Sequence, residues 1–266
     1  MSTTTDYYNI SDSLTEEQKL IRNATKDWVN KYVKPNIEEH FQKEETPAYI
    51  IQELSKIGAF GLIIPEKYGG VGADYISFGL MMQELEKGDS SIRVISSIQT
   101  SLVMYAIYRF GSEEQRLKYL PKLASGELLG AFGLTEPDFG SNPSSMHSYY
   151  KQKEDKIFIN GSKMWIGNAE TADIAIIWVK DENQKVRGII IETNNISNYS
   201  TTTINNKWSF RSSKTGELVF SNSETSIDQV LEKSTSIKDA YECLNIGRYA
   251  GAWGSAQPPQ VTNPLL

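Results

Sequence analysis

The stretch YLPKLASGELLGAFGLTEPDFGSNPSSM, residues 119–146, marks the point at which the pattern of the sequence changes. Before Gly126, apolar residues recur at the three- and four-residue intervals typical of helices. From residue 131 to Val230, short runs of β-branched and aromatic residues alternate with Gly, Asn, Asp and Ser, as in short strands joined by turns. The pattern predicts an α+β chain, with an all-α domain followed by a small β-barrel or sandwich.

The helical part contains clear helix-start signals. Thr15 and Ser112 are each followed three residues later by Gln, which is the spacing of a capping box. Thr46-Pro47 and Gly58 are typical of a helix start and end. These signals and the apolar spacing predict helices over residues 15–35, 46–58, 76–86, 92–110 and 113–123.

The second part predicts strands over residues 156–160, 174–179, 186–192 and 217–220. Helical spacing returns over residues 236–253, and the chain then continues as SAQPPQVTNPLL, whose prolines exclude a helix. We therefore expect four parts: an α-helical domain (1–127), a β-barrel domain (128–235), the start of a further helical domain (236–254) and a non-helical tail (255–266).

The composition excludes several classes of protein. The chain has 33 acidic and 27 basic residues, a net charge of −6 and no basic cluster, which argues against a nucleic-acid-binding surface. It has no apolar run of about 18 residues, so no membrane span is expected. The N-terminus has no basic and apolar segments of a secretory signal, so the expected location is cytoplasmic. His40, His147 and Cys243 are not at metal-ligand spacing, so we expect no metal site. Any catalytic activity is therefore expected to depend on a bound cofactor.

Two segments carry the chemical information. Residues 131–146 are a strand end followed by a loop rich in hydroxyls and small residues, where backbone N–H groups can face a polar ligand. Taken alone, this loop is equally well a surface turn. Residues 160–168, NGSKMWIGN, place Trp165 on a strand, where a tryptophan is more often part of a core than a platform for a ligand.

Together, YLPKLASGELLGAFGLTEPDFGSNPSSM and NGSKMWIGNAETADIAIIW resemble the two flavin signatures of the acyl-CoA dehydrogenase family, in their order and spacing. LMMQELEKGDSSIRVISSIQTSLV (80–103) and FGSEEQRLKYLPKL (110–123) resemble its helical domain. NKWSFRSSKTGELVF (206–220) and CLNIGRYAGAWG (243–254) resemble its barrel end and the first helix of its C-terminal bundle. The resemblance covers residues 14–254 and is strongest to the glutaryl-CoA dehydrogenases within that family.

The resemblance implies an FAD enzyme that desaturates an acyl-CoA thioester: a carboxylate removes the α proton while the β hydride passes to flavin N5. It also implies an electron-transfer flavoprotein as redox partner and a homo-oligomer. The implied cofactor-binding residues form the two signatures, with Trp165 on the opposite face of the flavin from the first segment. They are Phe132, Leu134, Thr135, Gly140, Ser141, Trp165, Ile166 and Gly167.

The implied substrate is an acyl-CoA, here glutaryl-CoA, because the resemblance places Arg93 at the distal end of the acyl pocket. A guanidinium binds a free carboxylate through two parallel hydrogen bonds. The full implied set of substrate-binding residues is Arg93, Ser97, Ser141, Tyr241, Asn245 and Arg248. Two alternatives remain: Arg93 can pair with Asp89 or Glu86 at a helix end, and the last three residues can be one ordinary helix face.

The chain departs from the family pattern in three ways. Gly167 stands where the family has Thr or Ser, and Gly247 stands where it has Ala, which costs a helix about 1 kcal/mol. The family's C-terminal bundle, which carries the catalytic glutamate, has no counterpart after residue 254, so no catalytic residue is assigned. We therefore expect a truncated enzyme that is inactive alone. The alternative is a non-catalytic remnant that folds partly and binds flavin or acyl-CoA weakly.

A consequence expected from this ending concerns the helix at 236–253. Without the rest of a bundle, its apolar residues would be exposed and would favour self-association. These residues are Ile237, Tyr241, Leu244, Tyr249 and Trp253.

Overall fold

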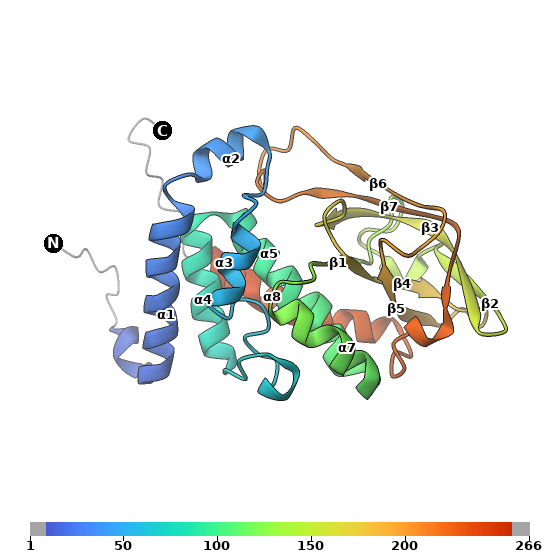
Figure 1. Ribbon diagram of the computed structural model, residues 1–266, viewed down its shortest axis with the longest axis horizontal. Coiled ribbons are helices and arrows are strands. Elements are labelled where there is room, and N and C mark those ends of the chain that lie inside the picture. The colour runs from blue at the N-terminus through green and yellow to red at the C-terminus, as the bar shows by residue number, and fades with distance from the viewer. Residues whose placement is uncertain (1–8, 257–266) are drawn as a thin grey trace.

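The computed structural model describes residues 9–256, with the helices on one side of the molecule and the sheet on the other (Figure 1). Thr15 and Ser112 both form the predicted capping boxes. The helical part consists of α1 (Glu16–Trp28), a π-helical turn (Val29–Val33), α2 (Ile37–Lys43), α3 (Ile50–Lys56), α4 (Tyr75–Gly88), α5 (Ser90–Ser97), a π-helical segment (Ile98–Met104), α6 (Tyr105–Phe110) and α7 (Glu113–Ala124).

The helix predicted over residues 92–110 is one continuous run in the structure. It starts at Ser90 because the carboxylate of Asp89 accepts a hydrogen bond from the N–H of Ser91. Its middle, Ile98–Met104, is π-helical, a conformation that is frequent at functional sites. This segment separates α5 from α6 and faces the first strand of the sheet.

The sheet has seven strands: β1 (Gly130–Gly133), β2 (Tyr149–Lys153), β3 (Lys156–Gly167), β4 (Ile174–Lys180), β5 (Val186–Glu192), β6 (Tyr199–Thr203) and β7 (Thr215–Ser226). Its order is β1-β4-β2-β3-β7-β6, with β5 paired to β4. The pairs β1–β4 and β2–β4 are parallel, whereas the other pairs are antiparallel. The curled mixed sheet after a helical part confirms the predicted fold class.

Helix α8 (Ile237–Ser255) follows the sheet and packs back onto the helical part, most extensively onto α4. Ile237 and Leu244 pack against the core that helices and sheet share, and Tyr249 and Trp253 pack against the core of the helical part. Gly79 of α4 makes this possible, because a Cβ there would lie 2.3 Å from the Trp253 ring. These four side chains are partly buried, so the prediction that they are exposed is wrong, whereas self-association of the chain stays a prediction. Residues 257–266, most of the predicted tail, lie outside the described residues.

Candidate functional site

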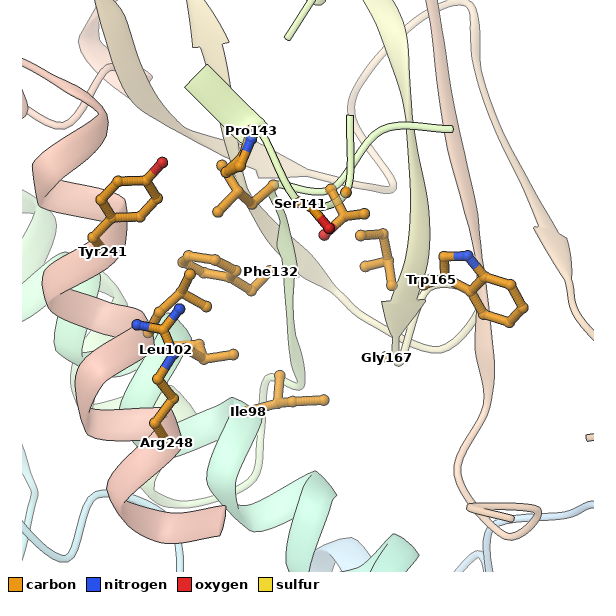
Figure 2. A pocket seen from close by; sticks show the side chains of 14 residues that line it. Ile98, Leu102, Phe132, Ser141, Pro143, Trp165, Gly167, Tyr241 and Arg248 are labelled. Carbon is orange, nitrogen blue, oxygen red and sulfur yellow. The ribbon is translucent and has the colours of Figure 1, made fainter. Parts of the chain in front are cut away.

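A cavity of about 420 Å³ lies where the two sequence segments meet the helices (Figure 2). Its volume is within the ~300–1,000 Å³ that is usual for small-molecule sites. The walls come from the π-helical segment, from β1 and the loop after it, from the end of β3 and from α8. The lining residues are Ile98, Leu102, Phe132, Leu134, Thr135, Gly140, Ser141, Pro143, Trp165, Ile166, Gly167, Tyr241, Leu244 and Arg248.

All eight residues predicted to bind the cofactor lie on these walls, and so do Ser141, Tyr241 and Arg248 of the predicted substrate set. Arg93, Ser97 and Asn245 do not line the cavity. Sequence reasoning missed four lining residues: Ile98, Leu102, Pro143 and Leu244. The four-residue spacing of Ile98 and Leu102, and the three-residue spacing of Tyr241 and Leu244, put each pair on one helix face and could have indicated them.

The first wall is β1 and the loop that follows it. Phe132 is buried and tilts against the ring of Trp178, with the centroids 6.1 Å apart. The carbonyl of Thr135 accepts a hydrogen bond from the N–H of Met164 (2.8 Å), which ties the loop to β3. Within residues 9–256, the hydroxyls of Thr135 and Ser141 have no hydrogen-bond partner. Both are therefore available to a ligand.

The second wall is a bulge near the end of β3. The register with β7 shifts between Lys163 and Ile166, and Trp165 between them has a left-handed backbone with φ 64°. Such a conformation is unfavourable for a residue with a large side chain. It turns the indole out of the core, so that Trp165 is 60% exposed and lies at the edge of the cavity, away from Tyr241 (Figure 2). The interpretation of Trp165 as a core residue is wrong.

Gly167 completes this wall. A Cβ at this position would lie 2.3 Å from Cδ1 of Ile98. The Ile98 side chain therefore occupies the space that a hydroxyl-bearing residue would need at position 167. The departure from the family pattern at Gly167 thus coincides with a bulky residue, Ile98, that packs directly against this position from the π-helical segment.

A buried ion pair that the sequence analysis missed lies behind the first wall. The ammonium of Lys163, which is fully buried, donates to a carboxylate oxygen of Glu136 at 2.8 Å and to the carbonyl of Leu134 at 3.3 Å. Glu136 also accepts hydrogen bonds from the backbone N–H groups of His147 (2.6 Å) and Ser148 (3.0 Å). This network joins both ends of the loop at 134–148 to β3 and so holds the Thr135 and Ser141 hydroxyls in place.

The charges of this pair are set by opposing effects. Burial lowers the pKa of Lys163 to about 8, against the attraction of Glu136. Burial also acts to raise the pKa of Glu136, but the Lys163 charge and the hydrogen bonds outweigh it and lower that pKa. Near neutral pH both groups are charged, and each depends on the other.

Arg93 lies outside the cavity, in a second ion pair. Its Nε is 2.6 Å from Glu86, and the two side chains are only 12% and 10% exposed. Glu86 in turn accepts a hydrogen bond from the Ser90 hydroxyl. The pairing with Glu86, one of the two alternatives weighed for Arg93, is therefore present. Arg93 precedes Ile98 by five residues, which is about 140° around a helix, so the two side chains leave different faces.

The other two predicted substrate residues that miss the cavity also have local partners. The hydroxyl of Ser97 is buried 3.2 Å from the Ser101 hydroxyl. Asn245 is exposed and accepts a hydrogen bond from Arg248 at 3.1 Å. Arg248 itself lines the cavity, so Asn245 contacts the site only through it.

No carboxylate belongs to the lining residues found in the described part of the chain. Glu136 is engaged by Lys163, and Glu242 accepts hydrogen bonds from Tyr105 and Arg109, each at 2.9 Å. Residues 9–256 also contain no cluster of three His, Cys, Asp or Glu side chains that could hold a metal ion. In the same range, no helix is long and apolar enough to cross a membrane.

Comparisons with known proteins agree with this arrangement. Residues 15–127 match the family model "Acyl-CoA dehydrogenase, N-terminal domain", and residues 131–223 match "Acyl-CoA dehydrogenase, middle domain". An acyl-CoA dehydrogenase of Bacillus subtilis (strain 168) is 35% identical over 239 residues, covering 88% of this chain and 63% of the relative. A glutaryl-CoA dehydrogenase of Desulfococcus multivorans is 35% identical over 259 residues, covering 93% and 64%. The chain thus spans 63–64% of the length of these two relatives.

Solved structures show the same likeness. A glutaryl-CoA dehydrogenase from Mycobacterium smegmatis in complex with FADH2 superposes with a TM-score of 0.90 at 35% identity, covering 93% of this chain and 64% of that one. A butyryl-CoA dehydrogenase from Megasphaera elsdenii gives a TM-score of 0.85 at 30% identity, covering 95% and 72%.

Proposed function

Because the chain belongs to the acyl-CoA dehydrogenase family, we propose that its 420 Å³ cavity holds the isoalloxazine ring of FAD beside the thioester end of an acyl-CoA. The observation that carries the proposal is the convergence of both sequence segments on one cavity. A strand, a bulged strand end and two helical elements contribute to its walls, although these residues lie up to 150 positions apart in the sequence.

The walls fit a flat ring with a polar edge. Phe132 and Leu134 provide an apolar surface, while the unpartnered hydroxyl of Thr135 can hydrogen-bond to the ring edge. Trp165, at the edge of the cavity away from Tyr241, would border the other side of the ring. Bound FAD would supply the hydride acceptor. The protein would supply orientation and hydrogen bonds to the ring, which is the usual division of work in cofactor enzymes.

We assign the part of the cavity that would hold acyl-CoA to the wall formed by α8 and to the loop after β1. Ser141 lies on the loop that cofactor and thioester would share, and Tyr241 and Arg248 project from α8 toward the same space (Figure 2). Arg248 carries a permanent positive charge, which suits the anionic part of a CoA thioester. No described lining residue can remove the α proton, so we assign binding and orientation, not the base, to these residues.

Two functions are compatible with these lining residues, and an experiment has to distinguish them. The first is an acyl-CoA dehydrogenase whose base comes from outside the described lining residues. The second is a protein that binds flavin or acyl-CoA without turnover, which the lack of a carboxylate among those lining residues favours. An intact family member would act as a homo-oligomer and pass its electrons to an electron-transfer flavoprotein, and we propose the same partners for the first function.

The narrower proposal is that the substrate is glutaryl-CoA and that Arg93 receives its distal carboxylate. Arg93 lies outside the cavity, on the helical run that also carries Ile98 and Leu102. Its guanidinium lies 5.9 Å from the centre of the Phe210 ring, and within residues 9–256 only its Nε has a hydrogen-bond partner. The two Nη groups remain free for a second carboxylate. Glu86 already pairs with Arg93, so the distal carboxylate of the substrate would have to share the guanidinium with Glu86 or displace Glu86 from it.

Flavin binding tests the broad proposal without requiring turnover. Purified protein titrated with FAD should quench flavin fluorescence, and Thr135→Val should weaken binding by up to about tenfold through the loss of one hydrogen bond. Thr202→Val is the matched control, because Thr202 is exposed on β6 and does not line the cavity. Absence of FAD binding, or equal affinities of the two variants, would refute the proposed site.

Anaerobic mixing with acyl-CoA then separates the two functions. Bleaching of the bound flavin would support dehydrogenation, whereas binding without bleaching would support the non-catalytic function. The glutaryl proposal is tested with Arg93→Gln, which should weaken binding of glutaryl-CoA at least about tenfold more than that of butyryl-CoA, because a neutral amide cannot form the charge-assisted pair. Equal losses for both thioesters would make Arg93 a structural residue.

A further inference from the structure

A second cavity, of about 680 Å³, shares no lining residue with the first. Its lining residues come from Ser112 and the first half of α7, from β2 and β5, and from residues 226–232 at and after the end of β7. Tyr119 of α7, Tyr150 of β2 and Arg187 of β5 contribute to its walls. The cavity therefore lies between the helical part and the sheet, away from the proposed flavin site.

Arg187 is the unusual residue of this cavity. Its guanidinium makes no hydrogen bond or ion pair with any residue of the described part, and its Nε is buried without a partner. An arginine keeps its charge at all ordinary pH values and has five N–H donors but no acceptor. A buried donor of a charged group is unfavourable without an acceptor, and no group of residues 9–256 accepts from this Nε–H.

Most other polar groups around the cavity already have partners. Lys118 pairs with Glu192 at 2.8 Å, and the side-chain amide of Gln115 donates to the carbonyls of Asp228 (2.7 Å) and Val230 (3.1 Å). Tyr150 differs, because its hydroxyl has no hydrogen-bond partner within residues 9–256. Burial raises the pKa of Tyr150, so this hydroxyl remains a donor. Arg187 and Tyr150 are thus two free donors that line one cavity.

The acidic residues of the same cavity restrict what these donors can accept. Glu114, Asp228 and Glu232 line it and are exposed. Their charges repel anions that carry several negative charges, such as nucleotides or free phosphate. A single carboxylate matches the planar guanidinium fork and adds only one negative charge.

We infer that this cavity binds a small organic acid with one carboxylate, which accepts hydrogen bonds from the Arg187 guanidinium and the Tyr150 hydroxyl. The rest of the molecule would face the acidic residues at the opening. This inference is independent of flavin and acyl-CoA, because none of its residues lines the first cavity.

Nuclear magnetic resonance of the arginine Nε–H groups tests the inference directly. Propionate should shift the Arg187 Nε–H resonance in a saturable manner, whereas neutral propanamide should not. Followed instead by the backbone amide resonance of Tyr150, which the variants retain, Arg187→Gln should weaken propionate binding at least about tenfold, since it removes the charge and the fork. Lys151→Gln is the matched control, because it removes one positive charge from exposed β2 without touching the cavity, and it should leave the affinity unchanged.

Each outcome decides the inference. An unshifted Arg187 resonance in wild-type protein would overturn it, and so would equal losses in the two variants. Inorganic phosphate binding at this resonance as tightly as propionate would overturn the assignment to a single carboxylate. If Arg187→Gln does not fold, the wild-type titration and Arg187→Lys replace it, and Arg187→Lys should bind more weakly because an ammonium cannot form the fork.

Discussion

Replacement of Lys163 by Met should destabilise the protein far more than the loss of an ordinary surface lysine. The ammonium is fully buried and lies 2.8 Å from Glu136, which is 5% exposed. Methionine fills similar space but leaves a carboxylate in the interior with only two backbone N–H donors. Removal of one partner of a buried ion pair typically costs about 3–5 kcal/mol. Because domains are usually stable by about 5–15 kcal/mol, this is a large fraction of the total.

The matched control is Lys156→Met, on the same strand. Lys156 also pairs with a glutamate, Glu224, but the two side chains are 53% and 41% exposed. Exposed pairs contribute about 0.2–1 kcal/mol, so this variant should remain close to wild type. The double variant Lys163→Met/Glu136→Gln should recover most of the loss, because Gln removes the unpaired charge and still accepts from the N–H groups of His147 and Ser148.

Urea unfolding at pH 7, followed by tryptophan fluorescence, measures these differences as changes in the midpoint at a constant m-value. Two results would refute the reasoning: similar losses for Lys163→Met and Lys156→Met, or no recovery in the double variant. The pH dependence supplies a second readout. Because the folded pKa of Lys163 is about 8, below the ordinary 10.5, the unfolded chain binds more protons between these values. Stability from this group therefore rises with pH across that window, and Lys163→Met should lack the rise.

Three further predictions concern packing and surface charge. Gly79→Ala should lower the free energy of unfolding by about 1–3 kcal/mol in urea titrations, because its Cβ would lie 2.3 Å from the Trp253 ring. Gly251→Ala on α8 should raise it by up to about 1 kcal/mol, since a Cβ there meets nothing within 4 Å; destabilisation by this variant would contradict the packing described for α8. Hydrogen bonds from Lys118 and then Tyr119 lower the pKa of Glu192 to about 2, so its contribution is present above pH 4.5 and lost as pH falls toward 2. Glu192→Gln should therefore cost less than about 1 kcal/mol at pH 7 and flatten the acid limb of a stability–pH curve.

Local signals in the sequence were sufficient for much of the fold. The capping boxes at Thr15 and Ser112 act within four residues, and the short apolar runs of β4 and β5 reflect burial of nearly every residue of each strand, so these features were predicted correctly. Strands β2 and β6 were not predicted. Their sequences, YYKQK and YSTTT, include only one buried residue, Tyr150, and they form strands because they pair with β3 and β7. Such pairing is decided by distant residues.

The candidate site shows the same division between local and distant effects. The cavity residues of both motif segments were identified because each segment is short and continuous. The Lys163–Glu136 pair was missed because it joins two segments 27 residues apart. One signal was available: buried Ile157 and Ile159 set an alternation that places Lys163 on the inward face of β3, where a lysine requires a partner. For Arg93, helical spacing limited the local partners to Asp89 and Glu86, and the structure shows the pairing with Glu86.

The two glycines that depart from the family pattern have a common physical basis. A Cβ at Gly167 would lie 2.3 Å from Cδ1 of Ile98, and a Cβ at Gly247 would lie 3.2 Å from Cδ2 of Leu102. Ile98 and Leu102 are four residues apart on the π-helical segment, and both line the cavity. One glycine is on β3 and the other is on α8. Each of these two elements therefore lacks a side chain at the point where it meets Ile98 or Leu102. The glycines are therefore part of how the cavity is shaped, and their effect on the site depends on the side chains at positions 98 and 102.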